Sequence, residues 1–214
     1  MEEPFEFFTS SELVFLTGRK ARNLSELLEG VKESSDASIF YHTHRFLIQH
    51  QYISPEPPND FAYWVSNVLL DRLVGEKLAA IDVIEYRTIK EIKNKIVEVL
   101  ESGVDANNTR YCPPGMEFHF MYSRIFVVST GKKASNLKEF VENLRIIPIR
   151  SIYFHMFQSR LRLENGDNDF SIWFREVLNE KELADKVSKI DPYTYTLEGL
   201  RNKIIRLVSE YVYG

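Results

Sequence analysis

Two short apolar runs in the chain have the pattern of β-strands. They are Glu12–Leu16 and Arg124–Val128, rich in large apolar or β-branched residues and followed closely by a Thr-Gly pair. Upstream of each run, apolar and polar residues alternate in Phe5–Phe7 and Phe118–Phe120, which would extend the strands. The pattern therefore predicts two similar strands, each ending at Thr-Gly.

After each strand the apolar spacing becomes helical. Asn23 and Asn136 are good N-cap residues, and a glutamate three positions later, Glu26 or Glu139, completes a capping box. The apolar face of the first of these helices consists of Leu24, Leu27, Leu28 and Val31.

Three further helices are predicted in each half of the chain. In the first half they start near Asp36, at Asp60 and at Thr88, and in the second half near Arg150, at Asp169 and at Thr196. Asp60 and Asp169 could each cap their own helix. The third helix of the first half has apolar residues at helical spacing, namely Phe61, Trp64, Val65, Val68 and Leu69.

The two halves resemble each other in sequence. Thr17–Leu24 returns as Thr130–Leu137, and the match continues without a gap to His42 and His155. After a shorter loop the alignment resumes, with Asn59-Asp60-Phe61 and Trp64 matching Asn168-Asp169-Phe170 and Trp173.

We therefore expect a mainly α (α+β) fold built by internal duplication of a strand-plus-four-helix unit. The repeat units are 1–103 and 116–214, and the linker at 104–115 carries Asn-Asn-Thr and Cys-Pro-Pro-Gly. A single buried strand cannot satisfy its own backbone groups. The two strands are thus expected to form a small antiparallel pair across a pseudo-twofold axis, giving one compact body.

Composition narrows the class of protein. The 214 residues are 44% hydrophobic and 27% charged, with a net charge of -4, which is ordinary for a soluble globular protein and gives no reason to expect nucleic acid. No secretory signal and no apolar stretch of membrane-spanning length is visible. Together with the single cysteine, Cys112, these features lead us to expect a cytoplasmic protein without a membrane partner.

The runs Phe40–Phe46 and Ser54–Trp64, with the Thr-Gly-x-Lys-Ala-x-Asn-Leu opening, resemble a bacterial and archaeal family known only as a domain of unknown function. The resemblance implies two tandem copies of the family's unit and no particular activity. The second copy departs from the pattern, because Asn165-Gly166-Asp167 replaces the prolines and Met156-Phe157 replaces Thr43-His44. A site in this segment would then be degenerate in the second copy.

The Thr-Gly-x-Lys turn is one candidate ligand site. A strand that ends at glycine before a helix presents free amides and the positive end of the helix dipole, which suits a phosphate, sulfate or carboxylate. The alternative is a tight turn with solvated basic side chains. The candidate ligand-binding residues are Gly18, Arg19, Lys20, Gly131, Lys132 and Lys133.

His42 and His155 occupy equivalent places on their helices. Each could act as an acid or base, with Asp60 or Asp169 orienting the ring. The alternative is a core histidine hydrogen-bonded to the same aspartate. The spacing of the histidines lacks the usual metal-ligand patterns, so we expect no metal.

Trp64 and Trp173 are the last candidates. With Tyr52, Asn59, Asp60 and Tyr63, Trp64 could line a sugar or other polar ligand site. The alternative is that these aromatic residues anchor a proline-stiffened loop to the core.

The leading hypothesis is a non-enzymatic binding or regulatory module for a small anionic or polar ligand, or for a partner protein. The alternative is an enzyme acting on a phosphorylated or sugar substrate through a His/Asp pair, with Lys20 holding an anion. A third class is a structural subunit that self-associates, for example as a homodimer. No sequence pattern calls for a cofactor.

Overall fold

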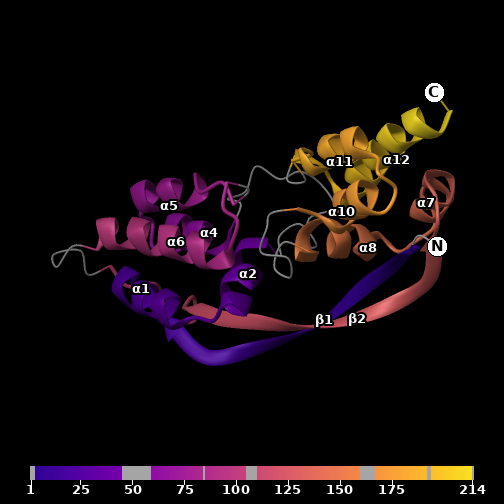
Figure 1. Cartoon of the computed structure of the whole chain (residues 1–214). Coiled ribbons are helices and arrows are strands. Elements are labelled where there is room, and N and C mark those ends of the chain that lie inside the picture. The colour runs from indigo at the N-terminus through magenta and orange to yellow at the C-terminus, as the bar shows by residue number, and fades with distance from the viewer. Residues whose placement is uncertain are drawn as a thin grey trace. The chain divides into compact units, whose positions relative to one another are not determined.

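The structure, a computed structural model, describes residues 3–44, 59–83, 85–104, 110–159, 167–191 and 194–213. These residues form helices and a two-stranded sheet, so the predicted mainly helical α+β class is confirmed (Figure 1). The predicted proline-rich loop Ser54–Pro58, its counterpart Glu164–Gly166 and Tyr52 lie outside the described residues.

The sheet pairs β1 (Phe5–Ala21) with β2 (Phe118–Ala134). The hydroxyl of Thr17 donates to the carbonyl of Phe120 at 2.9 Å, and that of Thr130 donates to the carbonyl of Phe7 at 2.7 Å. Residue numbers on facing positions thus rise on one strand as they fall on the other, and the strands are antiparallel. The rings of Phe15 and Tyr122 stack with their centroids 5.4 Å apart, which fits the strand register given by these two hydrogen bonds.

Both strands are longer than the sequence predicts. Neither ends at Thr-Gly, because β1 continues through Gly18 to Ala21 and β2 continues through Gly131 to Ala134. The two glycines have φ of 83° and 70°, a backbone conformation that glycine adopts at no steric cost. The predicted turn from the glycine directly into a helix is therefore wrong.

The described chain forms two compact units, and both strands contribute to each of them. The α1–α6 unit contains residues 12–44, 59–83, 85–104 and 110–124, and the α7–α12 unit contains residues 3–11, 125–159, 167–191 and 194–213. The boundary between the units falls within the strands, between residues 11 and 12 of β1 and between residues 124 and 125 of β2. The boundary predicted at residues 104–115 does not separate them.

The α1–α6 unit contains α1 (Leu24–Glu33), α2 (Asp36–His44), α4 (Asp60–Asn67), α5 (Arg72–Ala79) and α6 (Ile89–Gly103). The predicted caps Asn23 and Thr88 are present, and Thr88 forms a capping box with Glu91. The N-cap of α4 is Asn59, whose side chain accepts from the amide of Ala62, and not Asp60. Asp60 is thereby left to contact another side chain.

The third predicted helix is interrupted, and a further helix follows it. α4 ends at Asn67 and α5 begins at Arg72, with Leu70 between them at a φ of 57°. The amide of Asp71 donates to the carbonyl of Val65 at 3.0 Å, a six-residue closure typical of helix ends with a left-handed residue. Helical spacing alone does not reveal this break, because Val68 and Leu69 still fit the apolar pattern.

The α7–α12 unit contains α7 (Leu137–Leu144), α8 (Ile149–Tyr153), η1 (Phe154–Gln158), α10 (Asp169–Glu176), α11 (Lys181–Ser188) and α12 (Leu197–Tyr213). Asn136 and Asn168 cap α7 and α10. The helix predicted from Arg150 widens into a π-helix at Phe154, a feature that α2 lacks.

Aromatic side chains from the strands fill the core of each unit. In the α1–α6 unit Phe118 and Phe120 pack with Phe61 and Trp64. Phe120 also lies against Gly30, where an added Cβ would come within 2.1 Å of its ring. In the α7–α12 unit the equivalent core contains Phe5, Phe7, Phe140, Phe170 and Trp173.

Candidate functional site

His42 is buried and uses both ring nitrogens. Its Nδ1 lies 2.8 Å from Oδ2 of Asp60, and its Nε2 lies 3.0 Å from the amide nitrogen of Met121 on β2. An amide N–H can only donate, so Nε2 accepts and carries no proton. The ring is thus the neutral tautomer whose Nδ1–H donates to Asp60.

His155 makes the equivalent contacts in the other unit. Its Nδ1 lies 2.7 Å from Oδ2 of Asp169, and its Nε2 accepts from the amide of Phe8 on β1 at 2.9 Å. The contact between histidine and aspartate that the sequence suggests is therefore present in both units. Asp60 and Asp169 differ in environment, with side chains 49% and 16% exposed.

The two histidines bind the outer edge of a strand. In the α1–α6 unit Ser38, one helical turn before His42, donates its hydroxyl to the carbonyl of Met121 at 2.7 Å. Two side chains of α2 thus bond the N–H and C=O of one residue, as a neighbouring strand would. In the α7–α12 unit the equivalent Ser151 is buried, and its hydroxyl has no hydrogen-bond partner among the described residues.

These contacts restrict the chemistry that His42 can perform. General base catalysis needs an imidazole nitrogen within hydrogen-bond reach of a substrate proton. Nε2 of His42 instead accepts from a backbone amide, and Nδ1 donates to Asp60. Within the described ranges, no group of three or more His, Cys, Asp or Glu side chains is placed to hold a metal ion.

The two tryptophans anchor the residues that precede each strand. Nε1 of Trp64 donates to the carbonyl of Met116 at 2.7 Å, and Nε1 of Trp173 donates to the carbonyl of Glu3 at 3.2 Å. Both rings are buried. Neither presents an open face on which a sugar could stack.

The basic residues after Gly18 and Gly131 lie on the strands. Arg19 donates to the carbonyl of Glu29 and pairs with the carboxylate of Glu33. Lys133 lies 3.7 Å from the carboxylate of Glu6. Lys20 and Lys132 are exposed.

The start of α1 already has acceptors for its amides. Asn23 accepts from the amide of Glu26 at 2.8 Å, and the carboxylate of Glu26 accepts from the amide of Arg22 at 2.9 Å. The Arg22 side chain also donates to this carboxylate, and that side-chain hydrogen bond is the main cause that lowers the pKa of Glu26 and keeps it negative beside the helix N-terminus. An incoming anion would have to displace it.

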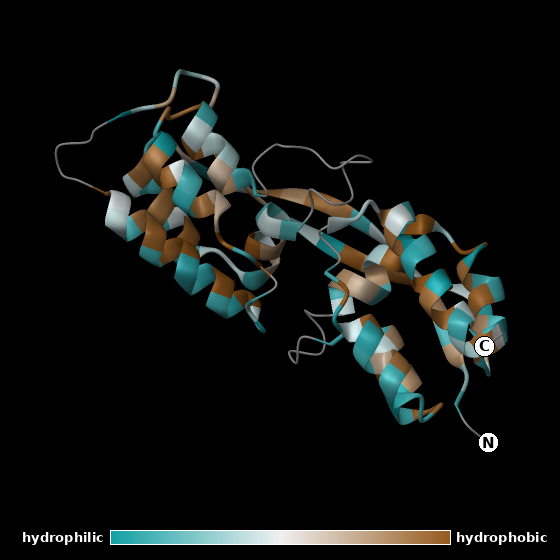
Figure 2. Ribbon diagram, turned by 90° about the horizontal axis from the view of Figure 1, so that it is seen from above, coloured by the Kyte–Doolittle hydropathy of each residue, from teal (hydrophilic) through white to brown (hydrophobic). Residues whose placement is uncertain are grey.

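The sequence reasoning missed an exposed apolar surface on the strands. Leu13 and Leu16 are 56% and 65% exposed, and Val14 and Phe15 between them are also exposed. The equivalent run Phe126–Val128 is exposed in the other unit. Figure 2 shows hydrophobic colouring along parts of the two strands. Four adjacent apolar residues with no polar alternation could have signalled a strand with apolar side chains on both faces.

The same stretches have an outer edge with no paired strand among the described residues. Backbone groups along an antiparallel strand alternate between pointing toward and away from the neighbouring strand. Met121 directs its N–H and C=O away from β1, and Leu16 lies opposite it in the register. Leu16, and Val14 two residues earlier, therefore direct their own N–H and C=O outward from β2.

The second unit repeats this arrangement on the other strand. Phe8 directs its amide outward to His155, and Ser129 lies opposite it. Ser129 and Val127 therefore direct their N–H and C=O outward from β1. Each unit thus has one strand edge bonded by a helix and one edge with no paired strand within the described ranges.

Together the fold and these contacts define a mainly helical α+β protein in which two strands each serve two helical units. A model described as "Family of unknown function (DUF5752)" matches residues 2–209. The chain belongs to this family. The match is a single copy over nearly the whole chain, where the sequence resemblance implied two tandem copies.

The chain is similar to a solved structure. It is the structure of OrfY from Thermoproteus tenax, which shares 31% sequence identity with a TM-score of 0.85. The similarity covers 97% of this chain and 95% of that one. No curated protein matches the sequence. In the part of the chain that the structure describes, no helix combines the length and the apolarity needed to cross a bilayer.

Proposed function

We propose that this protein is a non-enzymatic binding module that takes an extended segment of a partner protein along its open strand edges. The carrying observation is that Leu13–Leu16 combines exposed apolar side chains with a strand edge that has no paired strand among the described residues. An extended peptide that adds to such an edge gains main-chain hydrogen bonds and pockets for alternate side chains. Exposed apolar edges are otherwise a liability for aggregation.

The size and charge of the edge favour a peptide segment over a second copy. Four side chains cover far less than the ~800 Å² per partner that a standard stable interface buries. Each apolar run is followed by an exposed lysine, Lys20 or Lys132. A segment with apolar residues and an acidic residue at one end matches this surface.

We also propose that the chain arose by internal duplication. The support is that equivalent residues bond equivalent partners in the two units. His42, Trp64 and Thr17 bond β2 or the residues just before it, and His155, Trp173 and Thr130 do the same at β1. On this proposal the module has two binding edges, Leu13–Leu16 and Phe126–Val128.

The enzyme alternative receives no support from the His/Asp contacts. A catalytic His42 would have to release the amide of Met121 before Nε2 could take a substrate proton. We propose instead that both histidines hold the strands in place.

Site-specific photo-crosslinking tests the binding proposal. A photo-reactive amino acid at Leu16 is expected to crosslink to a partner protein in cells of the source organism. The same amino acid at Leu73, an equally exposed position (65%) on α5, is the matched control. Mass spectrometry of the product distinguishes the outcomes.

A partner peptide crosslinked at Leu16 and not at Leu73 supports the proposal. Crosslinks only to other copies of this chain would contradict a partner protein and would identify a second copy of the chain as the bound molecule. Equal crosslinking at both positions would show that the strand edge has no special role, and the proposal would be abandoned.

A further inference from the structure

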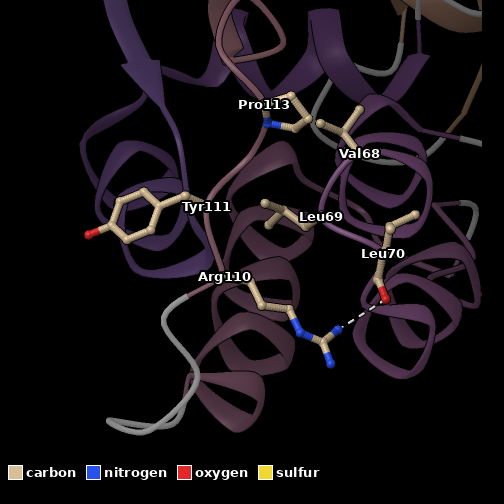
Figure 3. A pocket seen from close by; sticks show the side chains of 6 residues that line it. All are labelled: Val68, Leu69, Leu70, Arg110, Tyr111 and Pro113. Atoms are coloured by element: carbon tan, nitrogen blue, oxygen red, sulfur yellow. Dashed lines mark hydrogen bonds between the residues drawn. The ribbon is translucent and has the colours of Figure 1, made fainter.

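The α1–α6 unit has a cavity of about 490 Å³ beside the end of α4. Figure 3 shows it between the turn that follows α4 and the chain segment that leads toward β2, and it is lined by Val68, Leu69, Leu70, Arg110, Tyr111 and Pro113. This volume lies within the range of small-molecule sites in proteins, about 300–1,000 Å³. None of its lining residues belongs to Leu13–Leu16 or Phe126–Val128, so its function can be tested independently.

The lining combines apolar side chains with one cation. Arg110 is its charged residue, and no Asp or Glu lies among the described lining residues. Nη1 of Arg110 donates to the carbonyl of Leu70 at 3.1 Å, which holds the guanidinium against the turn (Figure 3). A guanidinium has five N–H donors in a planar fork that suits a carboxylate.

Leu70 occupies a costly backbone conformation. Its φ of 57° is left-handed, yet its side chain is 69% exposed. The equivalent turn of the other unit has the same φ at Asn179, a residue type that tolerates this conformation far better. An exposed leucine in this place gains nothing from the core, and an outlier of this kind is a reason to look for function.

We propose that this cavity binds a small amphipathic carboxylate. The apolar body lies against Leu69 and Leu70, and the carboxylate accepts from the guanidinium of Arg110. Leu70 contributes apolar contact that asparagine could not provide, which accounts for its presence in the strained turn.

Titration of the full chain with 3-phenylpropanoate, followed by NMR shifts and calorimetry, tests this inference. The matched neutral probe is 3-phenylpropan-1-ol, which has the same body without the charge. Loss of a charged hydrogen bond predicts binding of the alcohol that is weaker by about tenfold or more. Addition of the carboxylate is expected to change the NMR chemical shifts of the backbone amides of Leu69, Leu70 and Tyr111.

Two variants separate ligand contact from folding. Arg110→Gln is expected to weaken binding of the carboxylate by about tenfold, so that the carboxylate and the alcohol bind with similar affinity. Leu70→Asn is expected to keep or raise the midpoint of thermal unfolding, because asparagine tolerates the turn. The same variant is expected to bind both probes more weakly. Leu73→Asn, an exposed leucine on α5 outside the lining, is the control that leaves binding unchanged.

Three results would overturn the inference. They are no binding of the carboxylate at millimolar concentration, equal binding of the carboxylate and the alcohol to the unaltered chain, and Leu70→Asn binding that matches the unaltered chain.

Discussion

At the scale of single residues, the two buried histidines show how a residue that looks catalytic can serve the fold. His42 and His155 each bridge a helix to a strand amide through Nε2 and to an aspartate through Nδ1. A buried backbone amide left without its acceptor carries a desolvation penalty. The pair of contacts therefore explains why a polar ring lies among aromatic core residues.

Replacement of His42 by phenylalanine is expected to lower the free energy of unfolding by about 1–3 kcal/mol, because the amide of Met121 loses its acceptor. His42→Gln should cost less, since its side-chain oxygen can accept from the same amide. Urea unfolding of both variants measures the difference. A phenylalanine variant as stable as the unaltered protein would contradict the proposed role.

Cys112 allows a prediction about reactivity. The residue is buried, and burial raises the pKa of its thiol, with a smaller contribution from Glu117. A raised pKa leaves less thiolate at a given pH, and the thiolate is the nucleophile. Alkylation by iodoacetamide at pH 8 should be slower in the folded protein than in urea, and its rate should rise at a higher pH than for an exposed cysteine. Equal rates in both states would contradict this.

At the scale of elements, the strands show where sequence patterns succeed and fail. The apolar runs predict both strands, and Asn23 and Thr88 predict the starts of α1 and α6 correctly. The continuation through Gly18 could not be predicted, because it depends on the hydroxyl of Thr17 bonding a strand 103 positions away. The residues Thr-Gly are the same whether the chain turns at this point or continues as an irregular strand.

The positive φ of Gly18 leads to a test of this irregularity. Gly18→Ala has free space around its Cβ, so its expected cost of about 1–2 kcal/mol comes from the backbone conformation alone. Gly30→Ala is the contrasting case, because its Cβ would overlap the ring of Phe120 and overpacking costs about 1–3 kcal/mol. Thermal unfolding measures the stability of both variants. A Gly18→Ala variant as stable as the unaltered protein would argue against a need for glycine at this position.

At the scale of the whole molecule, the grouping of strands with helices could not be read from the sequence. The repeat suggests units that follow the order of the chain, with a boundary at 104–115. The core of the α1–α6 unit instead includes Phe118 and Phe120, and that of the α7–α12 unit includes Phe5 and Phe7. The two strand starts have the same apolar pattern, so either could serve either set of helices, and only the tertiary contacts distinguish them.

This grouping predicts which fragment folds. A fragment of residues 12–124 contains the helices of the α1–α6 unit with both of its strand segments. A fragment of residues 1–103 lacks Phe118 and Phe120, and truncation of even one buried phenylalanine costs about 3–5 kcal/mol. It also lacks Met121, the partner of His42 and Ser38.

The fragment 12–124 is therefore expected to unfold cooperatively on heating, while the fragment 1–103 shows no such transition. Circular dichroism of the two fragments measures this, and 12–124 carrying Phe120→Ala is the control that should melt earlier. Were 1–103 to fold as stably as 12–124, residues 5–11 would have to replace Phe118–Arg124 against the same helices. The sequence order, and not the strand grouping described above, would then define the stable unit.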